Sequence, residues 1–309
     1  MTARSEDDES RGVAAGDGPR VAVVGPGAIG ASIAAAVQRG GARPVLCGRT
    51  ALERLVVEPD GGDPVVVPGP VLTDPGEAGG PADLVLLAVK SHQTAAAGPW
   101  LQALTRPGTV VVVLQNGVEQ RRLVAPLAPG AVILPSVVWF PAESLAPGRV
   151  RLRGELHLTL PAEPAAPGVA ALLGAGGVRV ELAEDFTTAT WRKLALNAIA
   201  GLTVLAGRRS GMYRRPDIAS LARVLAVECL AVARAEGADL PEAVADELIA
   251  TLAAYPEDLG SSILFDREAG RALEWDARNG VITRLGAHHG IPTPASDVIV
   301  PLLAAASGD

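Results

Sequence analysis

The sequence predicts an α/β fold: an N-terminal Rossmann-type doubly wound sheet followed by an all-α C-terminal domain. Short apolar runs, typical of buried parallel strands, alternate with helical segments in the first part of the chain. A glycine-rich turn joins the first of these runs to a helix. After residue 185, long segments rich in Ala, Leu and Val have helical periodicity. The 309 residues also exceed what one hydrophobic core usually holds, which favours two domains.

The chain divides into three parts. Residues 1–19 are polar, acidic and glycine-rich, which predicts a disordered tail rather than a signal peptide. Residues 20–184 are expected to form the dinucleotide-binding domain. Residues 185–309 are expected to form a helical domain that contributes to substrate binding and could provide a homodimer interface.

The expected strands of the first domain are apolar runs over residues 21–24, 45–47, 84–89 and 110–114. Residues 31–38 predict the helix after the first strand. Residues 65–72, interrupted by Pro and Gly, predict an irregular edge hairpin. Peripheral strands are expected over 150–160 and 178–182, separated by a Pro-, Ala- and Gly-rich stretch. The helices expected in the second domain cover residues 188–206, 217–236, 241–255 and 267–289.

Composition excludes several functions. A net charge of −7 leaves no basic surface for nucleic acid, and no run of 18 apolar residues predicts a membrane span. The two cysteines, Cys47 and Cys229, form no CxxC motif, which favours a reducing, cytoplasmic compartment and no disulfide framework. His288 and His289 point about 100° apart on a helix, so we expect no metal site.

The six residues Gly25-Pro26-Gly27-Ala28-Ile29-Gly30 form a GxGxxG motif between the first strand and its helix. The first glycine permits a tight turn, the second lets the backbone approach a pyrophosphate, and the third lets the helix pack closely on the sheet. We therefore expect all six to bind a dinucleotide, with a purely structural turn as the alternative.

The residue after the second strand distinguishes NADP(H) from NAD(H). An NAD-binding site usually has an acidic residue about 20 residues after the motif, but no acid lies between Gly30 and Glu53. Arg49 follows the strand instead, and a guanidinium there can bind a 2′-phosphate. The alternative is a solvated surface arginine. We predict NADP(H).

Further motifs follow along the chain. Lys90 and Asn116, the latter in a QNG motif, follow two neighbouring strands, at the edge where an open parallel sheet binds its ligand. A WRKLxxN motif contains Lys193 and Asn197, and an SSxxxD motif contains Ser262; the Glu274 carboxylate comes downstream. From Arg20 onward, this combination resembles the ketopantoate reductase (2-dehydropantoate 2-reductase) family.

The resemblance implies roles for these side chains. Lys193 would be the general acid, and Glu274 the acid that orients substrate and lysine. Lys90 and Asn116 would face cofactor and substrate beside the nicotinamide. Asn197 and Ser262 would bind substrate, and Arg49 would match the family's arginine for the 2′-phosphate.

Elementary chemistry supports the lysine independently. Hydride addition to a ketone develops negative charge on oxygen, which a positioned ammonium can stabilise and protonate. Lys193 and Asn197 are four residues apart and share a helix face. Partial burial would lower the pKa of Lys193 toward the working pH.

Each candidate also has a structural alternative. Lys193 could be a snorkelling surface lysine, and Glu274 could pair on a helix surface with Arg278 at i,i+4. Ser262 could cap a helix. Asn116 could be a turn residue, and Lys90 a surface charge at a strand end.

The sequence departs from the family at two substrate-binding asparagines, which are absent near Gly201 and at Ser210. The prediction is NADPH-dependent reduction of a small 2-oxo acid, with 2-dehydropantoate (ketopantoate) to pantoate as the named case. The alternatives are a reductase of the same fold acting on another carbonyl or an imine, and a non-catalytic dinucleotide-sensing protein.

Overall fold

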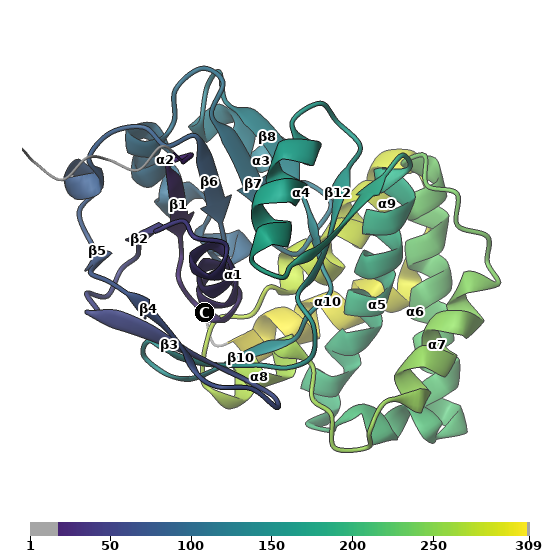
Figure 1. The fold of residues 1–309 in the computed structure, drawn as a ribbon. Helices are drawn as coiled ribbons and strands as arrows, with labels where there is room; N and C mark the ends of the chain where they lie inside the picture. Colours follow the sequence, from purple (N-terminus) through teal and green to yellow (C-terminus); the bar gives the residue numbers. More distant parts are fainter. Residues whose placement is uncertain (1–17, 308–309) are drawn as a thin grey trace, which may run out of the picture.

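A computed structural model of the chain describes residues 18–307. The predicted disordered tail, apart from its last two residues, lies outside this range. Figure 1 shows an α/β part, in purple to teal, beside a bundle of helices in green to yellow. Within the described range no helix combines the length and hydropathy that a membrane span requires.

The central sheet has six parallel strands in the order β5-β2-β1-β6-β7-β8. Their bounds are β1 Val21–Val24, β2 Val45–Cys47, β5 Val71–Leu72, β6 Leu84–Leu87, β7 Val110–Val113 and β8 Val132–Pro135. Alternate residues of β1 enter separate hydrophobic clusters on the two faces: Val21 and Val23 on one, Ala22 and Val24 on the other. The strands are therefore apolar throughout, as in a sheet covered on both faces.

Helices cover both faces of this sheet. Helix α1 (Ala28–Arg39) and helix α4 (Ala166–Ala175) belong to the first cluster. Helix α2 (Gly98–Leu104) and the short helix α3 (Gln120–Val124) contribute to the second. The doubly wound arrangement predicted from the sequence is confirmed.

Two smaller sheets extend the α/β part. One has the order β10-β11-β3-β4, from Ala142–Ala146, Arg149–Leu152, Arg54–Pro59 and Val65–Pro68. The other has the order β13-β12-β9, from Arg179–Ala183, His157–Pro161 and Val137–Val138.

The prediction of one edge hairpin over 65–72 was wrong. β4 pairs with β3, whereas β5 joins the central sheet beside β2. The chain changes sheet at Gly69, where a Cβ atom would lie 2.6 Å from the carbonyl oxygen of Glu53. Glycine is needed at this close approach of two backbone segments.

The remaining chain is helical. Its helices are α5 Phe186–Ala206, α6 Pro216–Ala235, α7 Val244–Ala254, α8 Ser262–Glu268, α9 Val281–His289 and α10 Pro294–Ser307. They share a separate hydrophobic cluster, and Asp185 caps the first of them by accepting a hydrogen bond from the amide of Thr188. We propose that this cap marks the boundary between the two predicted domains.

The continuous helix predicted over 267–289 was wrong. Gly270 has a φ of +63° just after α8 ends, and residues 271–274 are not helical. A π-helical turn, η6 (Asp276–Gly280), then precedes α9. Such turns are frequent at functional sites, and this one places Arg278 against Asn197 of α5 and Ser262 of α8. The stretch 161–177, predicted to be a separator, instead contains α4.

Candidate active site

The glycine-rich loop has the geometry that each glycine of the motif requires. Gly25 has a φ of +87°, and a Cβ on Gly30 would lie 2.2 Å from the carbonyl oxygen of Gly25. A Cβ on Gly27 would meet no atom within 4 Å, so the backbone at the start of α1 faces open space. The first amides of a helix lack partners within it and suit a phosphate. The loop therefore fits a dinucleotide pyrophosphate.

Arg49 lies close to this loop. It follows Gly48, where a Cβ would lie 3.1 Å from the ring of Pro26. Within residues 18–307 the exposed Arg49 side chain makes no ion pair. A guanidinium in this position has its donors free for an anion near the loop.

Glu274 joins the two parts of the molecule. It is only 4% exposed, and its carboxylate accepts hydrogen bonds from the amide of Ser91 (3.0 Å) and Nδ2 of Asn116 (3.0 Å). The Lys90 ammonium lies 3.5 Å from it. Glu274 thus does not pair with Arg278 on a helix surface; it precedes η6 and points toward the strand ends.

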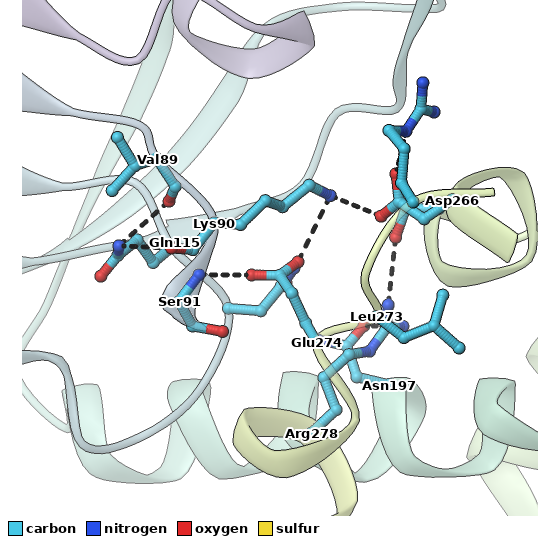
Figure 2. Close-up of polar contacts among 12 residues, drawn as sticks. Val89, Lys90, Ser91, Gln115, Asn197, Asp266, Leu273, Glu274 and Arg278 are labelled. Atoms are coloured by element: carbon cyan, nitrogen blue, oxygen red, sulfur yellow. Dashed lines mark hydrogen bonds and ion pairs between the residues drawn. The ribbon is translucent and has the colours of Figure 1, made fainter. Parts of the chain in front are cut away.

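Lys90 has a second carboxylate partner. Figure 2 shows the Lys90 ammonium directed at Asp266. Its Nζ lies 2.6 Å from Oδ2 of Asp266, and Nε of Arg271 is 2.9 Å from the other Asp266 oxygen. Burial alone would lower the pKa of Lys90, but Glu274 and Asp266 together raise it. Lys90 is therefore an ammonium that holds helix α8 and Glu274 against the end of β6.

The pKa of Glu274 moves in the opposite direction to that expected from burial alone. Burial raises it, but Lys90, the amide of Ser91 and the charge of Arg278 outweigh that effect and lower the pKa to about 2. Glu274 is thus a carboxylate at neutral pH, and it acts here by accepting hydrogen bonds.

Lys193 has a different environment. Its Nζ lies 4.9 Å from the centre of the Trp139 ring, and within residues 18–307 no carboxylate forms an ion pair with it. Burial, with a smaller contribution from Arg278, lowers its pKa to about 8. Lys193 is therefore poised to donate a proton near neutral pH.

Lys193 and Asn197 line one small cavity with Asn116, Ser136 and Val138. Its volume is about 10 Å³, roughly the space of one water. A larger cavity of about 170 Å³ lies alongside, with Asn116 and its neighbour Gly117 in both walls. A substrate therefore requires the parts of the molecule to separate slightly here.

The amides connect these groups into one network. Nδ2 of Asn197 donates to Oδ1 of Asn116 (3.1 Å), and Asn116 donates onward to Glu274. Arg278 donates to Oδ1 of Asn197 and to Oγ of Ser262, each at 3.2 Å. Ser262 is the first residue of α8, but Oγ of its neighbour Ser261 makes the cap.

The structure thus gathers Lys90, Asn116, Lys193, Asn197, Ser262 and Glu274 at one cleft. The glycine loop and Arg49 lie by the same end of the central sheet. The sequence analysis included Asp266 only as the last residue of the SSxxxD motif, without a role, and gave Arg278 only a surface pairing with Glu274. Nothing marked Arg278 as part of this network, because an arginine is ordinarily solvated.

One sequence signal was overlooked. Lysine occurs only twice in the chain, at positions 90 and 193, although Lys and Arg together number 27. Both lysines lie in this cleft, and arginine supplies every other side-chain cation apart from histidine. Because lysine shifts its pKa and releases protons far more readily than arginine, this distribution indicates a need for a titratable amine.

The two expected asparagine positions lack amides for identifiable reasons. A Cβ on Gly201 would lie 3.2 Å from Oδ1 of Asn279, so the amide of Asn279 fills that space. Ser210 is turned away, and its hydroxyl donates to the carbonyl of Leu259 at 2.8 Å. Neither position adds a polar group to the cleft.

Comparison with known proteins finds relatives of both parts of the chain. Residues 21–164 match the family model described as ketopantoate reductase PanE/ApbA, and residues 185–307 match the model of its C-terminal part. A 2-dehydropantoate 2-reductase of Mycobacterium tuberculosis is 53% identical over 287 residues, covering 93% of this chain and 97% of that protein.

Solved structures share the whole fold. A PanE/ApbA family ketopantoate reductase from Ralstonia eutropha has a TM-score of 0.85 at 32% identity, covering 93% of this chain and 98% of that one. A ketopantoate reductase from Staphylococcus aureus, described as dimeric, has a TM-score of 0.83 at 26% identity over the same shares.

Proposed function

The chain belongs to the ketopantoate reductase family, and on that premise we propose that it catalyses the NADPH-dependent reduction of 2-dehydropantoate to pantoate. The observation that carries the proposal is the half-buried ammonium of Lys193, with a pKa lowered to about 8, in a cavity shared with Asn116 and Asn197.

The cofactor is a nicotinamide dinucleotide, which when bound supplies the hydride. Gly25, Pro26, Gly27, Ala28, Ile29 and Gly30 would hold its pyrophosphate. Preference for NADP(H) is part of the proposal, and it rests on Arg49, whose donors have no ion-pair partner in the described structure. Lys90 and Asn116 would face the cofactor from the strand ends.

Lys193 acts as the general acid. It holds a proton on Nζ and delivers it to the carbonyl oxygen of the substrate as negative charge develops there. The substrate binds between α5 and the loop that contains Asn116, and these two segments separate to admit it. The ring of Trp139 covers one side of the ammonium and limits the access of water there, which strengthens the interaction of the ammonium with the oxygen.

The remaining groups position the substrate. Asn116, Asn197 and Ser262 offer amide and hydroxyl donors to its oxygens. Glu274 accepts hydrogen bonds from Asn116 and so fixes the direction in which that amide points. Glu274 thus acts on the substrate chiefly through Asn116 and Lys90.

Assembly as a homodimer is also proposed. The S. aureus relative is described as dimeric, and four large apolar side chains are exposed on α6 and α10: Leu221, Val224, Val298 and Leu302. A cytoplasmic location stays a prediction.

The test is NADPH oxidation, followed by absorbance, with 2-dehydropantoate and a panel of other 2-oxo acids. We expect turnover with 2-dehydropantoate that falls at least about a hundredfold in Lys193→Ala, the usual contribution of a general acid. Turnover only with other carbonyl or imine compounds would select a different substrate. NADPH binding without any turnover would favour a dinucleotide sensor.

A further inference from the structure

The side chain of Arg278 is only 2% exposed, yet none of the described carboxylates lies within ion-pair distance of it. Its two terminal nitrogens donate to neutral acceptors, Ser262 Oγ and Asn197 Oδ1, and its Nε has no partner within residues 18–307. A buried charge is costly unless it is paired and fully hydrogen-bonded. The guanidinium is therefore incompletely satisfied.

Neighbouring carboxylates do not satisfy it. Asp266 and Glu274 influence Arg278 through space, but their oxygens are bonded to other donors, chiefly Lys90. When Lys193 is protonated, Lys90, Lys193 and Arg278, together with the exposed Arg271 on Asp266, outnumber these two carboxylates. The cleft is thus short of negative charge.

Arg278 is hydrogen-bonded to two groups that a ligand can reach. Its partner Ser262 is exposed, and its other partner Asn197 lines the cavity of Lys193. Figure 2 shows the guanidinium beside Asn197, on the same side of the network as Glu274. An anion between Ser262 and Asn197 would lie beside the cavity that Lys193 and Asn197 line.

We propose that Arg278 binds the carboxylate of the 2-oxo acid substrate and sets the preference of the site for acids over uncharged carbonyl compounds. The substrate carboxylate takes the place of the neutral acceptors, Ser262 Oγ and Asn197 Oδ1. It accepts charge-assisted, bidentate hydrogen bonds from the guanidinium. This inference rests on the proposed function and names the group that recognises the charged end of the substrate, while Lys193 serves the carbonyl end.

The test measures binding rather than turnover. Pantoate, its methyl ester and oxamate are titrated calorimetrically into protein saturated with NADP⁺. We expect the wild type to bind pantoate at least about tenfold more tightly than the ester, and Arg278→Gln to abolish that difference by weakening pantoate alone. Arg278→Lys should retain part of the preference, because it keeps the charge and loses the fork.

Arg223→Gln is the matched control. Arg223 is an exposed helical arginine whose ion pairs are with Glu242 and Asp246 on the far side of α6 from the cleft network. It should leave the ratio of acid to ester binding unchanged. The NADP⁺ affinity of every variant, measured by fluorescence, verifies that the α/β part is intact.

Two results would overturn the inference: a folded Arg278→Gln protein with the wild-type preference for acid over ester, or a wild type with no such preference. If Arg278→Gln does not fold, the inference is tested by the ratio of pantoate binding to ester binding in Arg278→Lys and in the wild type. A further outcome separates the two proposals. If the protein binds NADP⁺ but never reduces 2-dehydropantoate, the proposed reaction is refuted. If the Arg278 variants of that protein still lose pantoate binding, the carboxylate site is supported.

Discussion

Because the chain contains only two lysines, the ionisation of the proposed acid can be observed directly. Labelling with lysine enriched in ¹³C at Cε gives two side-chain signals, from Lys90 and Lys193. Burial lowers the pKa of Lys193 to about 8, whereas two carboxylates raise that of Lys90 above its ordinary 10.5. The two signals should therefore titrate at least 2 pH units apart.

The same ionisation determines the rate. A group with a pKa of about 8 is about nine-tenths protonated at pH 7 and about one-tenth protonated at pH 9. Since the acid must hold its proton before transfer, kcat/KM for 2-dehydropantoate should fall about tenfold between these two pH values.

One variant connects the two measurements. Lys193→Arg removes one NMR signal and so assigns it; the residual activity should lack the step near pH 8, because a guanidinium does not titrate there. The reasoning is refuted if both lysine signals titrate together above pH 10, or if the step in kcat/KM persists without Lys193.

Three other variants test the rest of the site. Arg49→Gln should raise KM for NADPH about tenfold or more and leave KM for NADH unchanged; an equal effect on both cofactors would contradict a 2′-phosphate role. Gly27→Val should weaken dinucleotide binding without lowering the melting temperature, since its side chain meets open space; unchanged binding by fluorescence would count against the loop. Glu274→Gln should remove a stabilisation that the wild type has in full above pH 4.5 and loses toward pH 2, because the folded pKa is the lower one. The difference corresponds to about 3 kcal/mol of unfolding free energy at neutral pH, and urea titrations showing the same acid dependence in wild type and variant would disprove it.

The sequence was sufficient for features determined by local pattern. Apolar runs marked β1, β6 and β7, and the glycine loop followed from its spacing. It was insufficient where long-range packing decides. Pro301 lies within helix α10, and nothing local indicated that the bundle would hold residues 294–307 as a helix. Segment 54–59 became a strand by pairing with two distant segments.

The site shows the same division. The lysines, Asn116 and Glu274 could be proposed from motifs, but the role of Arg278 could not. Its burial depends on Asn197, 81 residues away in the chain. In the sequence, Arg278 follows Glu274 by four residues, a spacing that favours a pair on a helix surface. In the structure, residues 271–274 are not helical. Glu274 therefore contacts Ser91 and Asn116, whereas Arg278 contacts Asn197 and Ser262.

The two lysines have a further consequence, for covalent chemistry. An amine-directed acylating reagent finds no other lysine in the chain, and at neutral pH Lys193 provides far more of the nucleophilic free amine than Lys90. Its cavity, with a volume of about 10 Å³, is too small for a reagent unless α5 and the loop of Asn116 separate, as the proposed entry of the substrate requires. The rate at which Lys193 becomes acylated therefore reports how often the cleft opens, and bound ligands should slow it in proportion to the time that they keep the cleft closed.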